Sequence, residues 1–134
     1  MTTPKARSVA TPLVITGAAL LDFALITVFS FQGRLSHGHS VEGLQVFATA
    51  WPFLLGALLG WIACRVWRFP SAVLNGVWVW LSTIGVGFLL RWVTNAGVAP
   101  AFLLVATGML LLFLVGWRLI AAAFRMLSRE PRSD

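Results

Sequence analysis

The sequence has few charged residues. Only 10% of its 134 residues are Asp, Glu, Lys or Arg, whereas 59% are hydrophobic. Soluble domains carry about 25% charged residues and about 45–50% apolar ones. So little charge cannot cover a surface that faces water, which excludes an ordinary soluble domain and indicates that the solvent is lipid.

Cysteine and tyrosine are also scarce, since Cys64 is the only cysteine and tyrosine is absent. A single thiol excludes an intramolecular disulfide and a thiol pair for metal or redox chemistry. We interpret Cys64 as an inert thiol at the end of an apolar run. The aromatic content is instead rich in tryptophan, which often anchors helices at the level of the lipid headgroups. Four of the seven tryptophans fall near predicted interfaces: Trp61, Trp67, Trp92 and Trp117.

Recognisable catalytic motifs are missing as well. We find no glycine-rich phosphate loop, no zinc-protease motif and no nucleophile–base pair with a positioned third member. We therefore predict no cofactor and favour a role that is not enzymatic. The net charge of +6 does not indicate nucleic acid, because the Lys and Arg residues lie almost wholly between and beyond the apolar runs. Such residues are better explained as topology signals, and the predicted partner is the lipid bilayer.

Four long apolar runs are present, and they predict four membrane-spanning helices. The first run would span roughly 28 Å, close to a hydrocarbon core of about 30 Å. It contains Asp22 and lacks a small-x-small cleavage site, so we do not interpret it as a cleaved signal peptide. We predict a cytoplasmic leader at 1–12, a transmembrane domain at 13–125 with helices at about 13–31, 44–64, 71–92 and 99–124, and a cytoplasmic tail at 126–134.

The positive charges are distributed unequally about these helices. Four crossings place both termini on one side of the membrane. Only Arg34 and Arg91 lie on the other side, whereas the side of the termini holds Lys5, Arg7, Arg65, Arg68, Arg118, Arg125, Arg129 and Arg132. Cytoplasmic segments are enriched in such residues. We therefore predict an all-α, four-transmembrane-helix bundle in the plasma membrane, with both termini in the cytoplasm.

Small residues and proline in the second helix indicate how it packs. Pro52 removes a backbone hydrogen bond and should kink the helix or start it anew. Gly56 and Gly60 form a G-x-x-x-G pair, which would let a neighbouring helix approach closely. After the first helix, Gly33 is predicted to be the C-terminal cap.

Asp22 is the main candidate for chemistry within the membrane. Inserting an ionised carboxylate at mid-membrane costs about 2.5–3.5 kcal/mol, so the group should face protein or water. It could be a proton or cation site. Alternatively, it could be a structural carboxyl group bonded to the third helix, whose polar residues include Asn75, Trp78 and Ser82. Both interpretations stay open at this point.

A second polar group, Arg34, His37 and Arg91, lies on the outer side, where either arginine could bind lipid phosphate. Either arginine could instead pair with Glu42. A direct ion pair between Arg91 and Asp22 is not expected, because the two differ in depth by roughly 13 Å. His37, His39 and Glu42 are weak candidates for a metal site, since they lie in a flexible turn and lack a fourth ligand. We therefore favour a solvated turn and predict no bound metal.

The sequence resembles a family of short bacterial integral membrane proteins, which is catalogued only as a domain of unknown function. The resemblance covers about residues 13–125. It is carried by Asp22, the turn Gly33-Arg34 with His37, the run Ala50-Trp51-Pro52-Phe53-Leu54, Gly60-Trp61, Arg91 and Trp117-Arg118. It implies four helices in a bacterial inner membrane and names no activity or substrate.

Three functions fit these features. The first is a small homo-oligomeric transporter or channel linked to protons or cations, with Asp22 as the binding group and Arg34, His37 and Arg91 at the outer mouth. The second is a non-catalytic accessory or scaffold subunit of a larger membrane complex. The third and least supported is an enzyme acting on a lipid or quinone headgroup, with His37 as the base.

Overall fold

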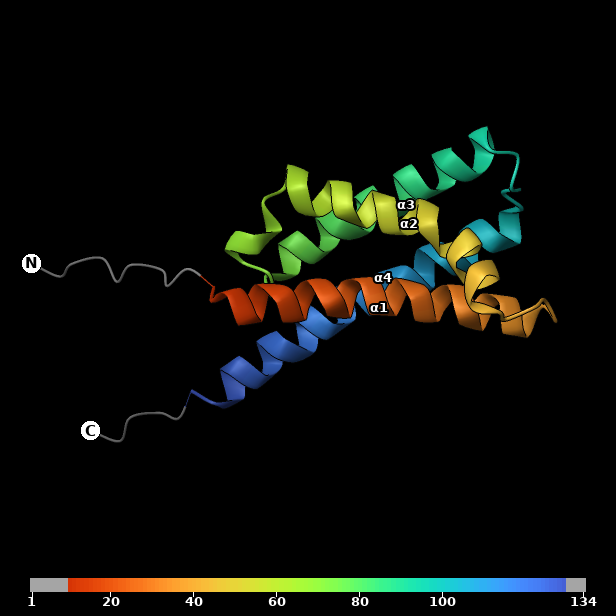
Figure 1. The fold of residues 1–134 in the computed structure, drawn as a ribbon. Helices are drawn as coiled ribbons and strands as arrows, with labels where there is room; N and C mark the ends of the chain where they lie inside the picture. Colours follow the sequence, from red (N-terminus) through yellow and green to blue (C-terminus); the bar gives the residue numbers. More distant parts are fainter. Residues whose placement is uncertain (1–9, 130–134) are drawn as a thin grey trace, which may run out of the picture.

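The computed structural model describes residues 10–129, and these form an all-α bundle (Figure 1). Each of its four long helices is long and apolar enough to cross a membrane. They are α1 (Pro12–Ser36), α2 (Gly43–Ala63), α3 (Val73–Val93) and α4 (Pro100–Leu127), with the short 3-10 helix η1 (Val66–Arg68) between α2 and α3. Most of the predicted leader and the end of the predicted tail lie outside the described residues.

Local sequence explains where the helices begin. Pro12 and Pro100 occupy first-turn positions of α1 and α4, where the missing N–H has no intrahelical partner to lose. The hydroxyl of Thr11 accepts a hydrogen bond from the amide of Val14 at 3.4 Å and caps α1.

The end of α1 differs from the prediction. The helix continues five residues past the predicted end at Phe31, and Gly33 lies inside it. The predicted cap at Gly33 is therefore wrong. The chain leaves the helix near Gly38, which has a φ of +67° that glycine adopts without steric cost. As a result, Arg34 lies on the last turn of a helix and not in a mobile turn.

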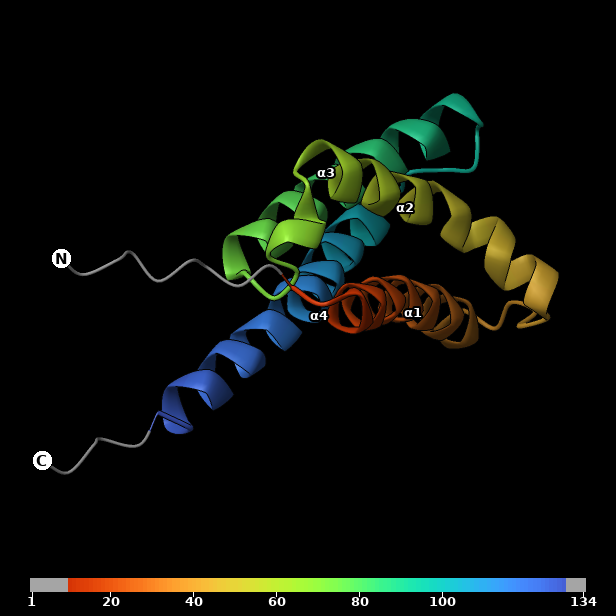
Figure 2. The same cartoon turned by 60° about the vertical axis from the view of Figure 1, so that its left-hand side comes forward.

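The helices run up and down, so their ends gather in two groups. The start of α1, the end of α4 and the connection between α2 and α3 lie at one end of the bundle (Figure 1). The turns after α1 and after α3 lie at the other end. We call these the terminal end and the loop end. The second half of α4 diverges from the other helices toward its C-terminus, as the rotated view also shows (Figure 2).

The closest packing in the bundle joins α2 to α3. Gly56 and Gly60 both lie in this contact. A Cβ atom at Gly56 would come within 2.8 Å of the carbonyl oxygen of Ser82, and one at Gly60 within 2.9 Å of the Ser82 Cβ. The hydroxyl of Ser82 donates a 2.7 Å hydrogen bond to the carbonyl of Gly56. The helix α2 continues through the buried Pro52 as one element, so it does not start anew there.

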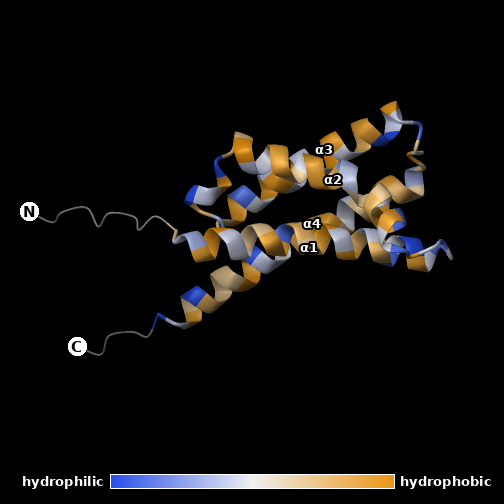
Figure 3. Cartoon of the chain, viewed as in Figure 1, coloured by the Kyte–Doolittle hydropathy of each residue, from blue (hydrophilic) through white to orange (hydrophobic). Residues whose placement is uncertain are grey.

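Most of the surface of the helices is apolar. Figure 3 shows hydrophobic residues along all four helices, with hydrophilic ones mainly toward their ends and turns. Large side chains such as Leu13, Leu74 and Leu104 are exposed. Because water would penalise this exposure, the outward faces fit contact with lipid chains.

Candidate functional site

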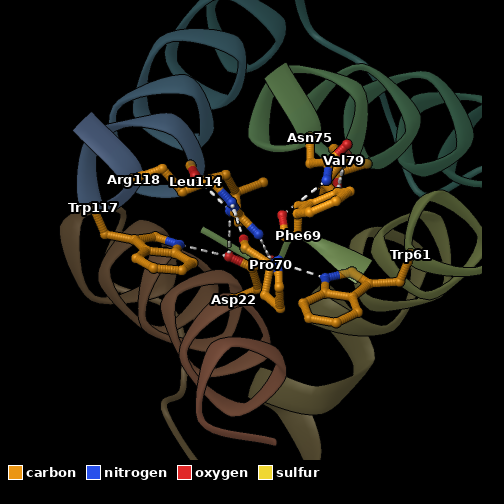
Figure 4. Close-up of polar contacts among 10 residues, drawn as sticks. Asp22, Trp61, Phe69, Pro70, Asn75, Val79, Leu114, Trp117 and Arg118 are labelled. Carbon is orange, nitrogen blue, oxygen red and sulfur yellow. Dashed lines mark hydrogen bonds and ion pairs between the residues drawn. The ribbon is translucent and has the colours of Figure 1, made fainter. Parts of the chain in front are cut away.

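Asp22 lies inside the terminal half of the bundle and is fully buried. Figure 4 shows its carboxylate between the indoles of Trp61 and Trp117, with the guanidinium of Arg118 beside it. The Trp61 Nε1 donates to Oδ2 at 2.9 Å, and the Trp117 Nε1 donates to Oδ1 at 2.8 Å. These donors come from α2 and α4, so the carboxylate joins three helices.

Arg118 forms an ion pair with Asp22 and is equally buried. Its Nη1 donates to Oδ1 at 2.9 Å, and its Nη2 donates to Oδ2 at 2.7 Å. This is the two-pronged geometry in which an arginine binds a carboxylate most strongly. Its remaining bonds go to backbone carbonyls, from Nε to Pro70 at 2.8 Å and from Nη1 to Leu114 at 2.7 Å. We call Asp22, Trp61, Trp117 and Arg118 the buried polar cluster.

The hydrogen bonds of the buried polar cluster are all made within the protein. Both carboxylate oxygens of Asp22 accept two hydrogen bonds each. Among residues 10–129, no buried side-chain nitrogen or oxygen lacks a partner. A cation could reach Asp22 only by displacing Arg118 or an indole. In this conformation the carboxylate therefore ties helices together and offers no free ligand.

The structure corrects several sequence-based interpretations of this region. Asp22 is not bonded to α3: Asn75 donates to the carbonyl of Phe69 at 2.8 Å, and Trp78 is exposed. Arg118 is not a topology signal at the membrane surface, because it is buried inside the bundle. Trp61 and Trp117, which were expected near the interfaces, use their indole N–H groups as donors to the carboxylate.

A signal for the ion pair appears once the observed ends of the helices are known. Asp22 lies ten residues after the start of α1, and Arg118 lies nine residues before the end of α4. At about 1.5 Å per residue, these distances along the helix are roughly 15 and 14 Å from the same end of the bundle. Equal depth identifies Arg118 as a possible partner, whereas Arg91 lies at the opposite end. Gly76 completes the site, since a Cβ there would lie 2.6 Å from the Arg118 Cδ.

The loop end contains a cavity of about 670 Å³. Its cationic and imidazole lining comes from Arg34, His37, His39 and Arg91, and its apolar lining includes Phe29, Ala48, Phe102 and Val105. The structure thus brings together the three residues that were predicted to form an outer mouth. Arg34 lies at the end of α1, His37 in the following turn and Arg91 at the end of α3. We call this space the loop-end cavity.

Both arginines of the loop-end cavity are held in place without an acid. The Arg34 Nε donates to the carbonyl of Ser40 at 2.6 Å, and its Nη1 donates to the hydroxyl of Thr49 at 3.0 Å. The Arg91 Nε and Nη2 donate to the carbonyls of Gly97 and Ala96 at 3.1 and 3.0 Å. A guanidinium has more N–H groups than these bonds use.

Neither arginine of the cavity is neutralised by a carboxylate within the described part of the chain. The ion pair of Asp22 with Arg118 is the only one among residues 10–129, so the expected alternative of pairing with Glu42 does not occur. The loop-end cavity therefore has an uncompensated positive charge, which suits an anion better than a cation.

The imidazoles do not assemble into a metal site. The rings of His37 and His39 have centroids 6.4 Å apart. Across residues 10–129, no group of three or more His, Cys, Asp or Glu side chains could hold a metal ion.

Four phenylalanines form a cluster next to the cavity, two of which (Phe29 and Phe102) line it, and their arrangement was not predicted. Phe53 contacts Phe29 and Phe88 edge-on, each at a centroid distance of 5.9 Å, and lies 6.2 Å from Phe102. Gly87 allows the ring of Phe53 to lie against the backbone of α3. The four rings come from four different helices, so spacing within any one helix could not reveal the cluster.

Comparison with known proteins identifies a family but no function. Residues 19–121 match a family model described as "Protein of unknown function (DUF3054)". No curated protein and no solved structure matches the chain.

Proposed function

Since the chain belongs to the DUF3054 family, whose function is unknown, we propose its function from geometry alone: it is a small membrane transporter for a negatively charged solute. The loop-end cavity receives the solute. The buried polar cluster closes the opposite end of the path. One observation carries this proposal, namely that a single bundle is hollow at one end and tied shut by an ion pair at the other.

In this proposal both termini face the cytoplasm of a bacterial cell. Arg65, Arg68, Arg125 and Arg129 belong to the terminal end, whereas Arg34 and Arg91 belong to the loop end. The positive-inside tendency then places the loop-end cavity on the outer side. Even without the buried Arg118, more positive residues lie at the terminal end than at the loop end.

The proposed role of Asp22 is that of a gate and not that of a cation ligand. Arg118 joins Asp22 on α1 to the carbonyl of Pro70, which precedes α3. Loss of the ion pair would release Asp22 from Arg118 and weaken this junction. Breaking the ion pair would therefore favour opening of the terminal end.

The test is the accessibility of single cysteines in proteoliposomes. Cys64 is first replaced by serine. Ala48→Cys then reports on the loop-end cavity, and Ala18→Cys reports on a buried position one helical turn from Asp22. We expect a charged, membrane-impermeant thiol reagent to label position 48 and to spare position 18 in the otherwise native chain.

The variant Asp22→Asn keeps the shape of the side chain and removes its charge. We expect labelling at position 18 to rise and labelling at position 48 to fall, because one end opens as the other closes. Unchanged labelling at both positions in the folded variant would overturn the proposal. Labelling of both positions, with loss of the folded state, would assign a purely structural role to Asp22.

A non-catalytic accessory role is the second candidate. The complete hydrogen bonding of the buried polar cluster favours it, because a rigid ion pair can serve assembly alone. Purification in mild detergent separates the two: a stoichiometric second protein favours the accessory role, and a homo-oligomer favours the transporter.

A further inference from the structure

The loop-end cavity combines a cationic part with an apolar part. We propose that it binds an anionic amphiphile, a molecule with a phosphate or carboxylate group at one end and a hydrocarbon chain at the other. This inference deepens the proposed function by naming the substrate class. It rests on that function only for the claim that the molecule crosses the membrane, since binding can be measured by itself.

The charged group would meet Arg34 and Arg91. Backbone carbonyls hold both guanidinium groups in place, so little side-chain entropy remains to be lost when an anion binds. Their remaining N–H groups have no carboxylate partner in the described part of the chain. Arginine binds phosphate and carboxylate through paired N–H donors, which makes these oxyanions the matching headgroups.

The hydrocarbon chain would meet the aromatic base of the cavity. Phe29 and Phe102 line the cavity with ring centroids 6.5 Å apart, and Val105 extends the apolar wall. The Arg91 guanidinium carbon lies 4.5 Å from the centre of the Phe102 ring, so charge and apolar wall adjoin directly. A small hydrated anion would gain nothing from this wall, whereas an alkyl chain would leave water on contacting it.

The size of the cavity agrees with such a ligand. Its volume of about 670 Å³ falls within the range of about 300–1,000 Å³ that is usual for small-molecule sites. The mixed lining of few charged groups and many apolar ones is also typical of such sites.

The experiment measures binding of radiolabelled dodecyl phosphate to the full chain in a neutral detergent, by scintillation proximity. Unlabelled dodecanoate should compete within about tenfold of dodecyl phosphate, because its carboxylate offers the same paired oxygens. Inorganic phosphate should compete at least about 100-fold more weakly, because it lacks the chain. Dodecyltrimethylammonium, which has the same chain and the opposite charge, should not compete.

Variants place the binding in the loop-end cavity. Arg34→Gln and Arg91→Gln should each weaken binding by about 10- to 100-fold, since each removes a charged hydrogen-bond donor. Arg68→Gln is the matched control, because it loses the same charge at the terminal end and should bind normally.

A second pair of variants distinguishes loss of binding from loss of the folded state. Gly33 lines the cavity, and a Cβ there meets nothing within 4 Å. The Cβ of Gly33→Leu therefore has room, and the added side chain should occupy the cavity and abolish binding. Gly17→Leu, equally unobstructed on the same helix, should leave binding intact.

If inorganic phosphate competed as well as dodecanoate, the proposal of an amphiphilic ligand would be overturned, and the cavity would be a simple anion site. Native binding by Gly33→Leu, or by both arginine variants, would overturn the site itself. Failure here is distinct from failure of the transporter proposal. Binding without reciprocal cysteine labelling would refute transport alone, and reciprocal labelling without binding would refute this inference alone.

Discussion

The two ends of the bundle use arginine in opposite ways. At the terminal end, Arg118 is fully buried and its charge is matched by Asp22. At the loop end, Arg34 and Arg91 are half-buried, fixed by carbonyl groups and unmatched by any acid among residues 10–129. A matched charge ties helices together, whereas a fixed and unmatched charge is ready for a ligand. Under the proposed function, this difference separates a closed end from a receiving end.

The largest expected effect comes from breaking the ion pair on one side only. Arg118→Leu leaves a buried carboxylate without its cation and should cost about 3–5 kcal/mol of unfolding free energy. The double variant Asp22→Leu with Arg118→Leu should recover much of that loss, because no unpaired charge remains. Reversible unfolding in mixed detergent micelles measures both.

The matched comparison at the other end is Arg34→Leu. It should cost at most about 2 kcal/mol, since it loses only two hydrogen bonds to neutral acceptors. If Arg34→Leu proved as costly as Arg118→Leu, the contrast between the two ends would collapse.

An effect smaller than that of Arg118→Leu is expected where α3 gives room to Arg118. In Gly76→Ala, the added Cβ would meet the Arg118 Cδ at 2.6 Å and the Leu114 carbonyl oxygen at 3.1 Å. Crowding of this kind typically costs about 1–3 kcal/mol. Gly85→Ala on the same helix has open space and should be neutral or slightly stabilising. Equal melting temperatures for the two variants would show that Arg118 can move freely.

The smallest expected effect sharpens the account of the receiving end. Thr49→Val removes the hydroxyl that holds the Arg34 Nη1 and should lower stability by about 0.5–1.5 kcal/mol. It should also weaken dodecyl phosphate binding by a few fold, because Arg34 becomes less well positioned. Binding that improves would mean that Thr49 competes with the ligand for Arg34.

Much of the fold could be predicted from the sequence, because an apolar run of about 20 residues has few structures open to it in lipid. Depth along each helix could be read as well, and the three residues placed together by depth, Arg34, His37 and Arg91, line one cavity. The lateral order of helices could not be read, so the partners of Asp22 were sought on α3. Helix spacing identifies the faces of one helix and does not say which other helix covers each face.

The contact between Asp22 and Arg118 also bears on how the chain enters the membrane. These residues are 96 positions apart, whereas Trp61 follows Asp22 by only 39. At about 5–20 residues per second, the ribosome needs roughly 5–20 seconds to make Arg118 after Asp22. During that interval α1 holds a carboxylate without its cation, and the indole of Trp61 is the first partner to arrive. A nascent chain that stops before α4 would therefore keep an acid on α1 without the cation that matches it in the complete bundle.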